Sequence, residues 1–139
     1  MAATIYLADT SVLVVRNQRP EIRQRIESLA GQGRLAVCQM SVLEYLNKAA
    51  SPASYELIWD QIQRQRWMDV TTEALNRALD VHRMLGATSQ HREYSLHDLI
   101  IAATAEQHGA TVLHYDADYD RIAAVTGQPM EWVAPKGSL

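Results

Sequence analysis

The strongest constraint on the fold is a regular alternation of short apolar runs with longer stretches of helical periodicity. Strands are predicted over residues 4–8, 35–38, 67–70, 110–115 and 130–133, and helices over residues 20–30, 41–50, 52–66, 72–85, 95–108 and 118–126. Ser, Thr, Pro or Asp begins each helix, and Gly or Pro follows most of them. This alternation predicts a single α/β domain whose central, mainly parallel sheet of about five short strands is flanked by helices.

Size and composition exclude several other classes of protein. The chain has 139 residues, of which 47% are hydrophobic and 21% charged, as in ordinary soluble domains that need no disulfide or structural metal to fold. The longest apolar stretch, Leu99–Ala105, is far shorter than the roughly 20 residues of a membrane-spanning helix. Asp9 interrupts the first apolar run, so we expect no signal peptide. The single cysteine, Cys38, fits a reducing cytoplasm.

Acidic residues stand at the ends of predicted strands and at the starts of predicted helices. Asp9 directly follows the first strand, and Asp116 directly follows the strand at 110–115. The carboxyl ends of parallel strands meet at one edge of a sheet, so these two acids converge if their strands are neighbours. Glu44 and Asp98 each follow a serine by three residues at the start of a helix. That spacing is also typical of a capping box, so each of these two acids alone fits a structural role.

The four acids together favour a metal site. Clustered carboxylates repel one another and need a cation unless one of them is protonated. A ligand set of carboxylate oxygens, with no cysteine pair and no histidines at the spacing of a zinc motif, favours Mg²⁺ or Mn²⁺. The implied chemistry is phosphoryl transfer or phosphodiester hydrolysis.

With these residues in view, the sequence resembles the PIN-domain ribonucleases of the VapC type, the toxins of bacterial type II toxin–antitoxin pairs. The matching segments are Leu7–Ser11, Ser41–Glu44, the run from His91 to Ala105, and Leu113–Ala123. Their order and spacing fit the family over about residues 4–133. One departure is Tyr119, which stands where many relatives carry Phe, in a chain that has no Phe.

The resemblance implies a PIN-like catalytic domain over residues 1–134, with strand order 3-2-1-4-5, and a short tail over residues 135–139. It implies a catalytic and metal-binding cluster of Asp9, Glu44 (directly or through a water), Asp98 and Asp116, with Asp118 as a further candidate ligand and Thr10 and Ser11 as supporting residues. One or two Mg²⁺ or Mn²⁺ ions would activate a water that cleaves RNA, either tRNA or another structured RNA. The implied partners are the RNA, a VapB-type antitoxin and a second copy of the chain, and the implied location is the bacterial cytoplasm.

The charge pattern is compatible with RNA. The net charge is −3, but the basic residues comprise 11 Arg and only 2 Lys, and Arg is suited to bidentate contacts with phosphate. Without the four site acids, the remainder of the chain carries a small positive charge. Arg92, in the predicted loop before the 95–108 helix, is the first candidate for an RNA contact.

Three other functions compete with RNA cleavage. A haloacid-dehalogenase-like phosphatase requires a second Asp two residues after the first, and Ser11 occupies that position. A receiver-like phospho-acceptor signalling domain requires paired acids after the first strand and a late lysine at the same edge, whereas Lys136 lies in the tail. A PIN-fold module that binds RNA or a partner without cleavage stays open.

Overall fold

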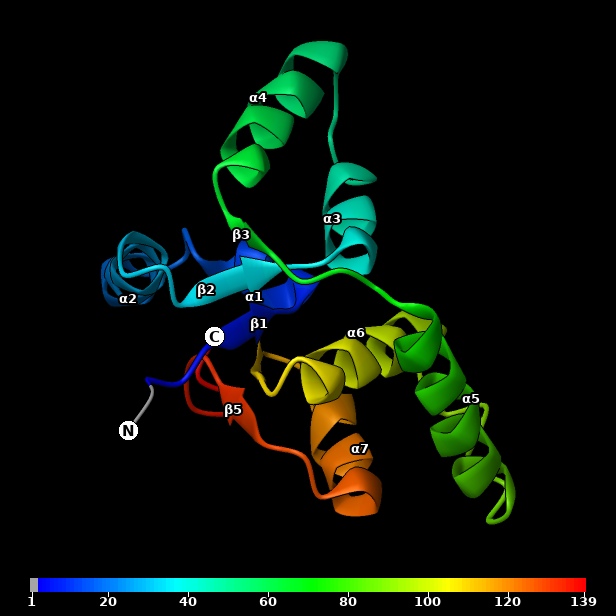
Figure 1. Cartoon of the computed structure of the whole chain (residues 1–139). Helices are drawn as coiled ribbons and strands as arrows, with labels where there is room; N and C mark the ends of the chain where they lie inside the picture. Colours follow the sequence, from blue (N-terminus) through cyan, green and yellow to red (C-terminus); the bar gives the residue numbers. More distant parts are fainter. Residues whose placement is uncertain (1–2) are drawn as a thin grey trace.

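A single parallel sheet of five strands forms the centre of the computed structural model, which describes residues 3–139 (Figure 1). The strands are β1 (Tyr6–Ala8), β2 (Leu35–Val37), β3 (Arg66–Trp67), β4 (Thr111–His114) and β5 (Met130–Trp132). Their order is β3-β2-β1-β4-β5, and every neighbouring pair is parallel. The predicted α/β class and strand order are therefore confirmed, and β1 and β4 are direct neighbours.

Seven helices connect the strands within the described residues. They are α1 (Thr10–Val15), α2 (Pro20–Gly31), α3 (Gln39–Leu46), α4 (Pro52–Gln63), α5 (Thr72–Gly86), α6 (Leu96–Gln107) and α7 (Asp118–Thr126). Figure 1 shows α2 on the opposite side of the sheet from α5 and α6, with α4 farthest from the centre of the domain and joined to it through α3. None of the helices in residues 3–139 is long and apolar enough to cross a membrane.

Helices cover both faces of the sheet, and successive side chains of β1 and of β4 pack into two different cores. Leu7 of β1 packs into the core under α5, α6 and α7, whereas Ala8 packs into the core under α1 and α2. In β4, Val112 packs into the core under α5, α6 and α7, and Leu113 packs into the core under α1 and α2. Because both faces are buried there, the central strands β1 and β2 consist of apolar residues without a charged side chain.

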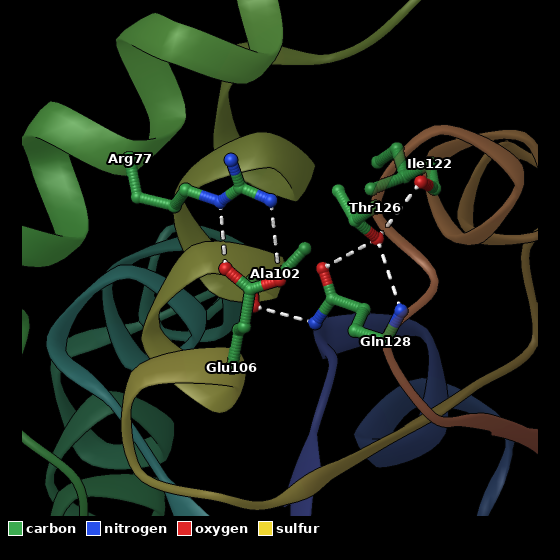
Figure 2. Close-up of polar contacts among 6 residues, drawn as sticks. All are labelled: Arg77, Ala102, Glu106, Ile122, Thr126 and Gln128. Carbon is green, nitrogen blue, oxygen red and sulfur yellow. Dashed lines mark hydrogen bonds and ion pairs between the residues drawn. The ribbon is translucent and has the colours of Figure 1, made fainter.

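Polar contacts fix α6 to its neighbours (Figure 2). The Arg77 guanidinium on α5 donates to the Glu106 carboxylate over 2.7 Å, and the buried Gln128 side chain donates to the carbonyl oxygen of Ala102 over 2.8 Å. These contacts join α6 to α5 on one side and to the segment between α7 and β5 on the other. The middle and the C-terminal end of α6 are thereby held against both neighbours.

The structure adds one helix that the sequence analysis did not predict. Residues 10–15 are mostly β-branched, which lowers helix propensity. The helix forms because Asp9 caps it: its carboxylate accepts a hydrogen bond from the backbone N–H of Ser11 over 3.1 Å. Helix α1 also packs against α3 and β4, so tertiary contacts outweigh the weak local preference.

Several predicted boundaries and caps were wrong. Helix α3 begins at Gln39 rather than Ser41, because Cys38 is the N-cap and its backbone N–H donates to the Ser41 hydroxyl over 3.2 Å. It ends at Leu46, and the chain turns before Pro52, which disfavours helical backbone at the residue before it. Helix α5 is capped by Thr71 rather than Thr72. Strand β3 covers residues 66–67 instead of 67–70 because only Arg66 and Trp67 align with β2.

The last residues of the chain lie against the domain. Ala134 and Leu139 pack on the core under α1 and α2, and the Leu139 backbone N–H donates to the Tyr115 hydroxyl over 2.8 Å. The predicted tail over residues 135–139 therefore contacts the end of β4.

Candidate metal centre

Five acidic side chains meet in one pocket at the carboxyl edge of the sheet. The pocket has a volume of about 380 Å³ and is lined by Asp9, Thr10, Ser11, Val14, Val15, Glu44, Lys48, Ser95, Asp98, Asp116 and Asp118. Asp9 follows β1 directly and Asp116 lies two residues beyond β4. Because β1 and β4 are neighbours, the fold brings these two acids together, as the spacing predicted. The other three come from α3, α6 and α7.

The carboxylates form two overlapping groups. One oxygen from each of Asp9, Glu44 and Asp98 lies within 4.8 Å of the others, and the same holds for Asp98, Asp116 and Asp118. Asp98 belongs to both groups, so it stands between them. This arrangement offers ligands for one or two cations.

Asp9 is held on both sides of its carboxylate. It is 3% exposed. Its Oδ2 accepts from the Ser11 hydroxyl over 2.6 Å, and its Oδ1 accepts from the Tyr119 hydroxyl over 2.6 Å. The Ser11 hydroxyl accepts in turn from the Tyr115 backbone N–H over 2.9 Å. Ser11 thus ties the end of β1 to the end of β4.

Neither Glu44 nor Asp98 caps the helix that carries it. Ser41, the presumed partner of Glu44, lies inside α3 and bonds to Cys38. Ser95 does cap α6, but its hydroxyl accepts from the His97 backbone N–H, and Asp98 accepts from the Tyr119 hydroxyl over 3.2 Å. Both acids are therefore free of the capping role that their spacing allowed.

The crowding of acids raises several pKa values. Burial, followed by the charges of Asp9 and Asp116, raises the pKa of Asp98 to about 8. Burial also raises the pKa of Glu44, and the charge of Asp9 adds to this effect. The pKa of Asp118 is raised by burial and by the charge of Asp116. A cation bound among these carboxylates would stabilise their ionised forms and so lower their pKa values again.

The donor set fits a hard divalent cation. Oε1 of Glu44 is buried and has no hydrogen-bond partner among residues 3–139, while Oε2 lies 3.5 Å from Nδ1 of His97. A buried carboxylate oxygen without a partner is costly, and a cation would satisfy it. All the clustered donors are carboxylate oxygens, the ligands that Mg²⁺ and Mn²⁺ prefer.

Two further predicted residues, Thr10 and Arg92, differ in whether they line the pocket. Thr10 lines the pocket, but its hydroxyl donates to the carbonyl oxygen of Ser41 over 3.3 Å and so joins α1 to α3. Arg92 is exposed in the turn before α6 and is not among the residues that line the pocket.

Sequence reasoning missed three polar groups at the site. The Tyr119 hydroxyl contacts both Asp9 and Asp98, and the replacement of Phe by Tyr at this position was the available signal. Lys48 lines the pocket from the turn that follows α3, two residues beyond the end of that helix. His97, which pairs with Glu44, had no signal beyond its position beside Asp98.

A second pocket lies on the far side of α6. It has a volume of about 360 Å³ and is lined by Leu75, Ala78, Leu79, His82, Leu96, Leu99 and Ile100. Its lining is almost wholly apolar, so it does not share the chemistry of the acidic pocket.

Comparison with known sequences gives matches over nearly the whole chain. The PIN domain family profile matches residues 6–125. Ribonuclease VapC51 of Mycobacterium tuberculosis (strain ATCC 25618 / H37Rv) is 42% identical over 134 residues, which cover 96% of this chain and 96% of the relative. Ribonuclease VapC18 of the same strain is 39% identical over 123 residues, which cover 87% of this chain and 90% of the relative.

Solved structures share the fold. A DNA-bound VapBC from Salmonella typhimurium superposes with a TM-score of 0.77 at 19% identity, covering 95% of this chain and 100% of that one. VapC20 of Mycobacterium tuberculosis, described as a toxin that cleaves the sarcin-ricin loop, has a TM-score of 0.60 at 16% identity, covering 84% of this chain and 93% of that one.

Proposed function

The chain belongs to the PIN-domain family, and on that premise we propose that it is a metal-dependent endoribonuclease of the VapC toxin type. The curated relatives that it matches over most of its length are named ribonucleases, which supports the cleavage of RNA. We expect this activity in the bacterial cytoplasm, where the RNA substrate is.

The observation that carries the proposal is the pocket of five acids. Carboxylates from three helices and two strand ends converge there, and one oxygen of Glu44 is buried without a hydrogen-bond partner among residues 3–139. A PIN-fold module that only binds RNA would gain nothing from such a cluster, because carboxylates repel phosphate. The pocket therefore favours hydrolysis over binding alone.

We propose that Asp9, Glu44, Asp98 and Asp116 hold one or two Mg²⁺ or Mn²⁺ ions, with Asp118 as an added ligand beside Asp116. Bound there, such an ion would lower the pKa of water and polarise a phosphodiester oxygen. Asp9 is rigidly held, and Asp116 accepts from the Asp118 backbone N–H over 2.9 Å. Oε1 of Glu44, which has no hydrogen-bond partner within the described part of the chain, would orient a water or accept its proton.

The RNA needs cationic contacts outside the acidic cluster. Lys48 is the cation among the residues that line the pocket, and Arg92 is exposed on the turn before α6. We propose that both contact phosphates of the RNA. The substrate class that we propose is a folded RNA such as a tRNA, whose looped strand can enter a pocket of this size.

An antitoxin of the VapB type is the proposed inhibitor. Several solved structures with this fold are VapBC complexes. Helix α4 exposes Tyr55, Leu57 and Trp59, so it offers apolar surface to such a partner. The segment after Val133 is a second proposed contact. An arginine from the antitoxin placed in the pocket would substitute for the charge of a metal ion.

We also propose that two copies of the chain form a homodimer. The exposed leucines Leu75, Leu79 and Leu96 surround the apolar pocket between α5 and α6. A second copy packed against this face would remove the leucines from water, which is favourable.

Cleavage of total RNA tests the proposed function. Purified wild type is compared with Asp98→Asn and with Asp60→Asn, a matched change at an exposed position on α4. Each protein is assayed in Mg²⁺, in Mn²⁺ and in EDTA, after mass spectrometry has shown that no antitoxin is bound. We expect wild type and Asp60→Asn to cut only with metal, and Asp98→Asn to lose at least about 100-fold in rate, as expected for a lost electrostatic contact at the reacting groups.

The other outcomes discriminate between the alternatives. Equal cutting by all three proteins would remove Asp98 from the site or reveal a contaminating nuclease. Retention of RNA by wild type without any cutting, in either metal, would favour the binding module. End-mapping of the products identifies the cleaved RNA.

A further inference from the structure

The Tyr119 hydroxyl lies directly between two of the acids in the pocket. Tyr119 is fully buried on α7, and its Oη is 2.6 Å from Oδ1 of Asp9 and 3.2 Å from Oδ1 of Asp98. Asp9 follows β1 and Asp98 lies on α6, so the phenol on α7 links three parts of the fold. A buried tyrosine hydroxyl needs a polar partner, and here both contacts are acids of the pocket.

The tyrosine ring is itself held in one place. Its centroid lies 4.9 Å from that of the buried His114 ring, which packs in turn against Trp132 at 4.9 Å. Nδ1 of His114 accepts from the Asp116 backbone N–H over 3.2 Å. The Tyr119 hydroxyl is therefore presented by a rigid aromatic layer, and its position cannot adjust freely to the acids.

From this geometry we propose that Tyr119 is a positioning residue whose hydroxyl orients Asp9 and Asp98 and so sets the affinity of the pocket for a divalent cation. Hydrogen bonds from Ser11 and Tyr119 occupy opposite oxygens of Asp9, which prevents rotation of that carboxylate. The same phenol restrains Asp98, the acid shared by both carboxylate groups. The inference rests on the proposed metal-dependent function.

The hydroxyl also acts against the mutual repulsion of the two acids. A donor shared by two carboxylates favours their ionised forms, which are the forms that bind metal. Without it, Asp9 would keep only Ser11 as a side-chain donor, and Asp98 would have no side-chain donor among residues 3–139. Loss of a partner of this kind typically weakens metal binding by 10- to 100-fold.

The test is Mn²⁺ binding to Tyr119→Phe, which keeps the ring and removes only the hydroxyl. Tyr6→Phe is the matched control, because Tyr6 lies on β1 with its phenol beside the Glu131 carboxylate, and it does not line the acidic pocket. Mn²⁺ alone is titrated into each protein, and free Mn²⁺ is followed by its electron paramagnetic resonance signal. Circular dichroism verifies that each variant is folded.

We expect Tyr119→Phe to bind Mn²⁺ at least about 10-fold more weakly than wild type, and Tyr6→Phe to bind it like wild type. In the RNA assay, excess Mn²⁺ should restore kcat of Tyr119→Phe while KM for RNA stays unchanged. Wild-type affinity in Tyr119→Phe would overturn the inference and leave the proposed function intact. Failure of wild type itself to bind Mn²⁺ would overturn both.

Discussion

The buried acid Asp98 predicts an unusual pH dependence of stability in the metal-free protein. Its pKa is raised from 3.8 to about 8 by burial and by the neighbouring acids. The folded protein therefore binds a proton at Asp98 at pH values where the unfolded chain has already released it. Stability must then fall as pH rises from about 4 to about 8, because a state that binds more protons is favoured by acid.

The size of the effect follows from these two pKa values. The pKa of Asp98 is 3.8 in the unfolded chain and about 8 in the folded protein. With these values, raising the pH from 6.5 to 8.5 lowers the free energy of unfolding by about 2 kcal/mol. For a domain of this length, that loss lowers Tm by about 7 °C. The raised pKa values of Glu44 and Asp118 act in the same direction. Burial lowers the pKa of His114, which acts in the opposite direction, but only below its ordinary value of 6.5.

The assay is thermal unfolding in EDTA, followed by circular dichroism at several pH values from 6.5 to 8.5. Wild type is compared with Asp98→Asn, which cannot ionise, and with Asp60→Asn, which changes an exposed acid on α4. We expect Tm to fall with pH in wild type and Asp60→Asn and to stay nearly level in Asp98→Asn. Saturating Mg²⁺ should also level the wild-type curve, because the metal binds the ionised carboxylates.

A fall in Tm of the same size in Asp98→Asn and wild type would refute this reasoning. It would mean that other groups carry the proton linkage and that Asp98 is ionised at neutral pH without metal. A wild-type Tm that rises across this range would refute the sign as well.

Three further predictions concern the surroundings of the pocket and the partner surfaces. Ser11→Ala removes a hydrogen bond to Asp9. We expect about 10-fold weaker Mn²⁺ binding, measured by calorimetry, and a loss of about 1–2 kcal/mol in the free energy of unfolding, measured with urea. An unchanged Mn²⁺ affinity would contradict the role of Ser11. Arg92→Ala should leave Tm unchanged, because Arg92 is exposed. It should raise KM for RNA several-fold and reduce the salt dependence of KM. A lower kcat at constant KM would contradict the proposed phosphate contact. Leu79→Asp, at a side chain that is 67% exposed, should convert a dimer to a monomer in light scattering at unchanged Tm, and a persistent dimer would move the interface away from α5 and α6.

Much of the fold was predictable because it depends on local patterns. The apolar runs and capping residues located five strands and six of the seven helices that the described residues form. The positions of Asp9 and Asp116 after neighbouring parallel strands made their meeting predictable, once the family resemblance supplied the strand order. Boundaries were less accurate where a side chain had two possible roles, as Ser41 did at the start of α3.

The role of Glu44 and Asp98 could not be read from their spacing. Both follow a serine by three residues, and the capping box and the metal site use the same residue types at that spacing. Only the packing of α3 and α6 around the end of β1 separates these two readings, because it places both carboxylates beside Asp9. The short helix α1 was missed for a similar reason, since tertiary contacts stabilise a segment of weak helix propensity.

The sequence by itself determined the α/β class, the strand ends that carry Asp9 and Asp116, and the hard-oxygen character of the site, because these follow from periodicity and residue type. Only the tertiary structure decided how the acids are held. The Tyr119 hydroxyl reaches two carboxylates that are 110 and 21 residues away along the chain. The packing of the described residues leaves Oε1 of Glu44 buried without a hydrogen-bond partner among them. Such contacts depend on the relative placement of distant elements, which local sequence patterns do not encode.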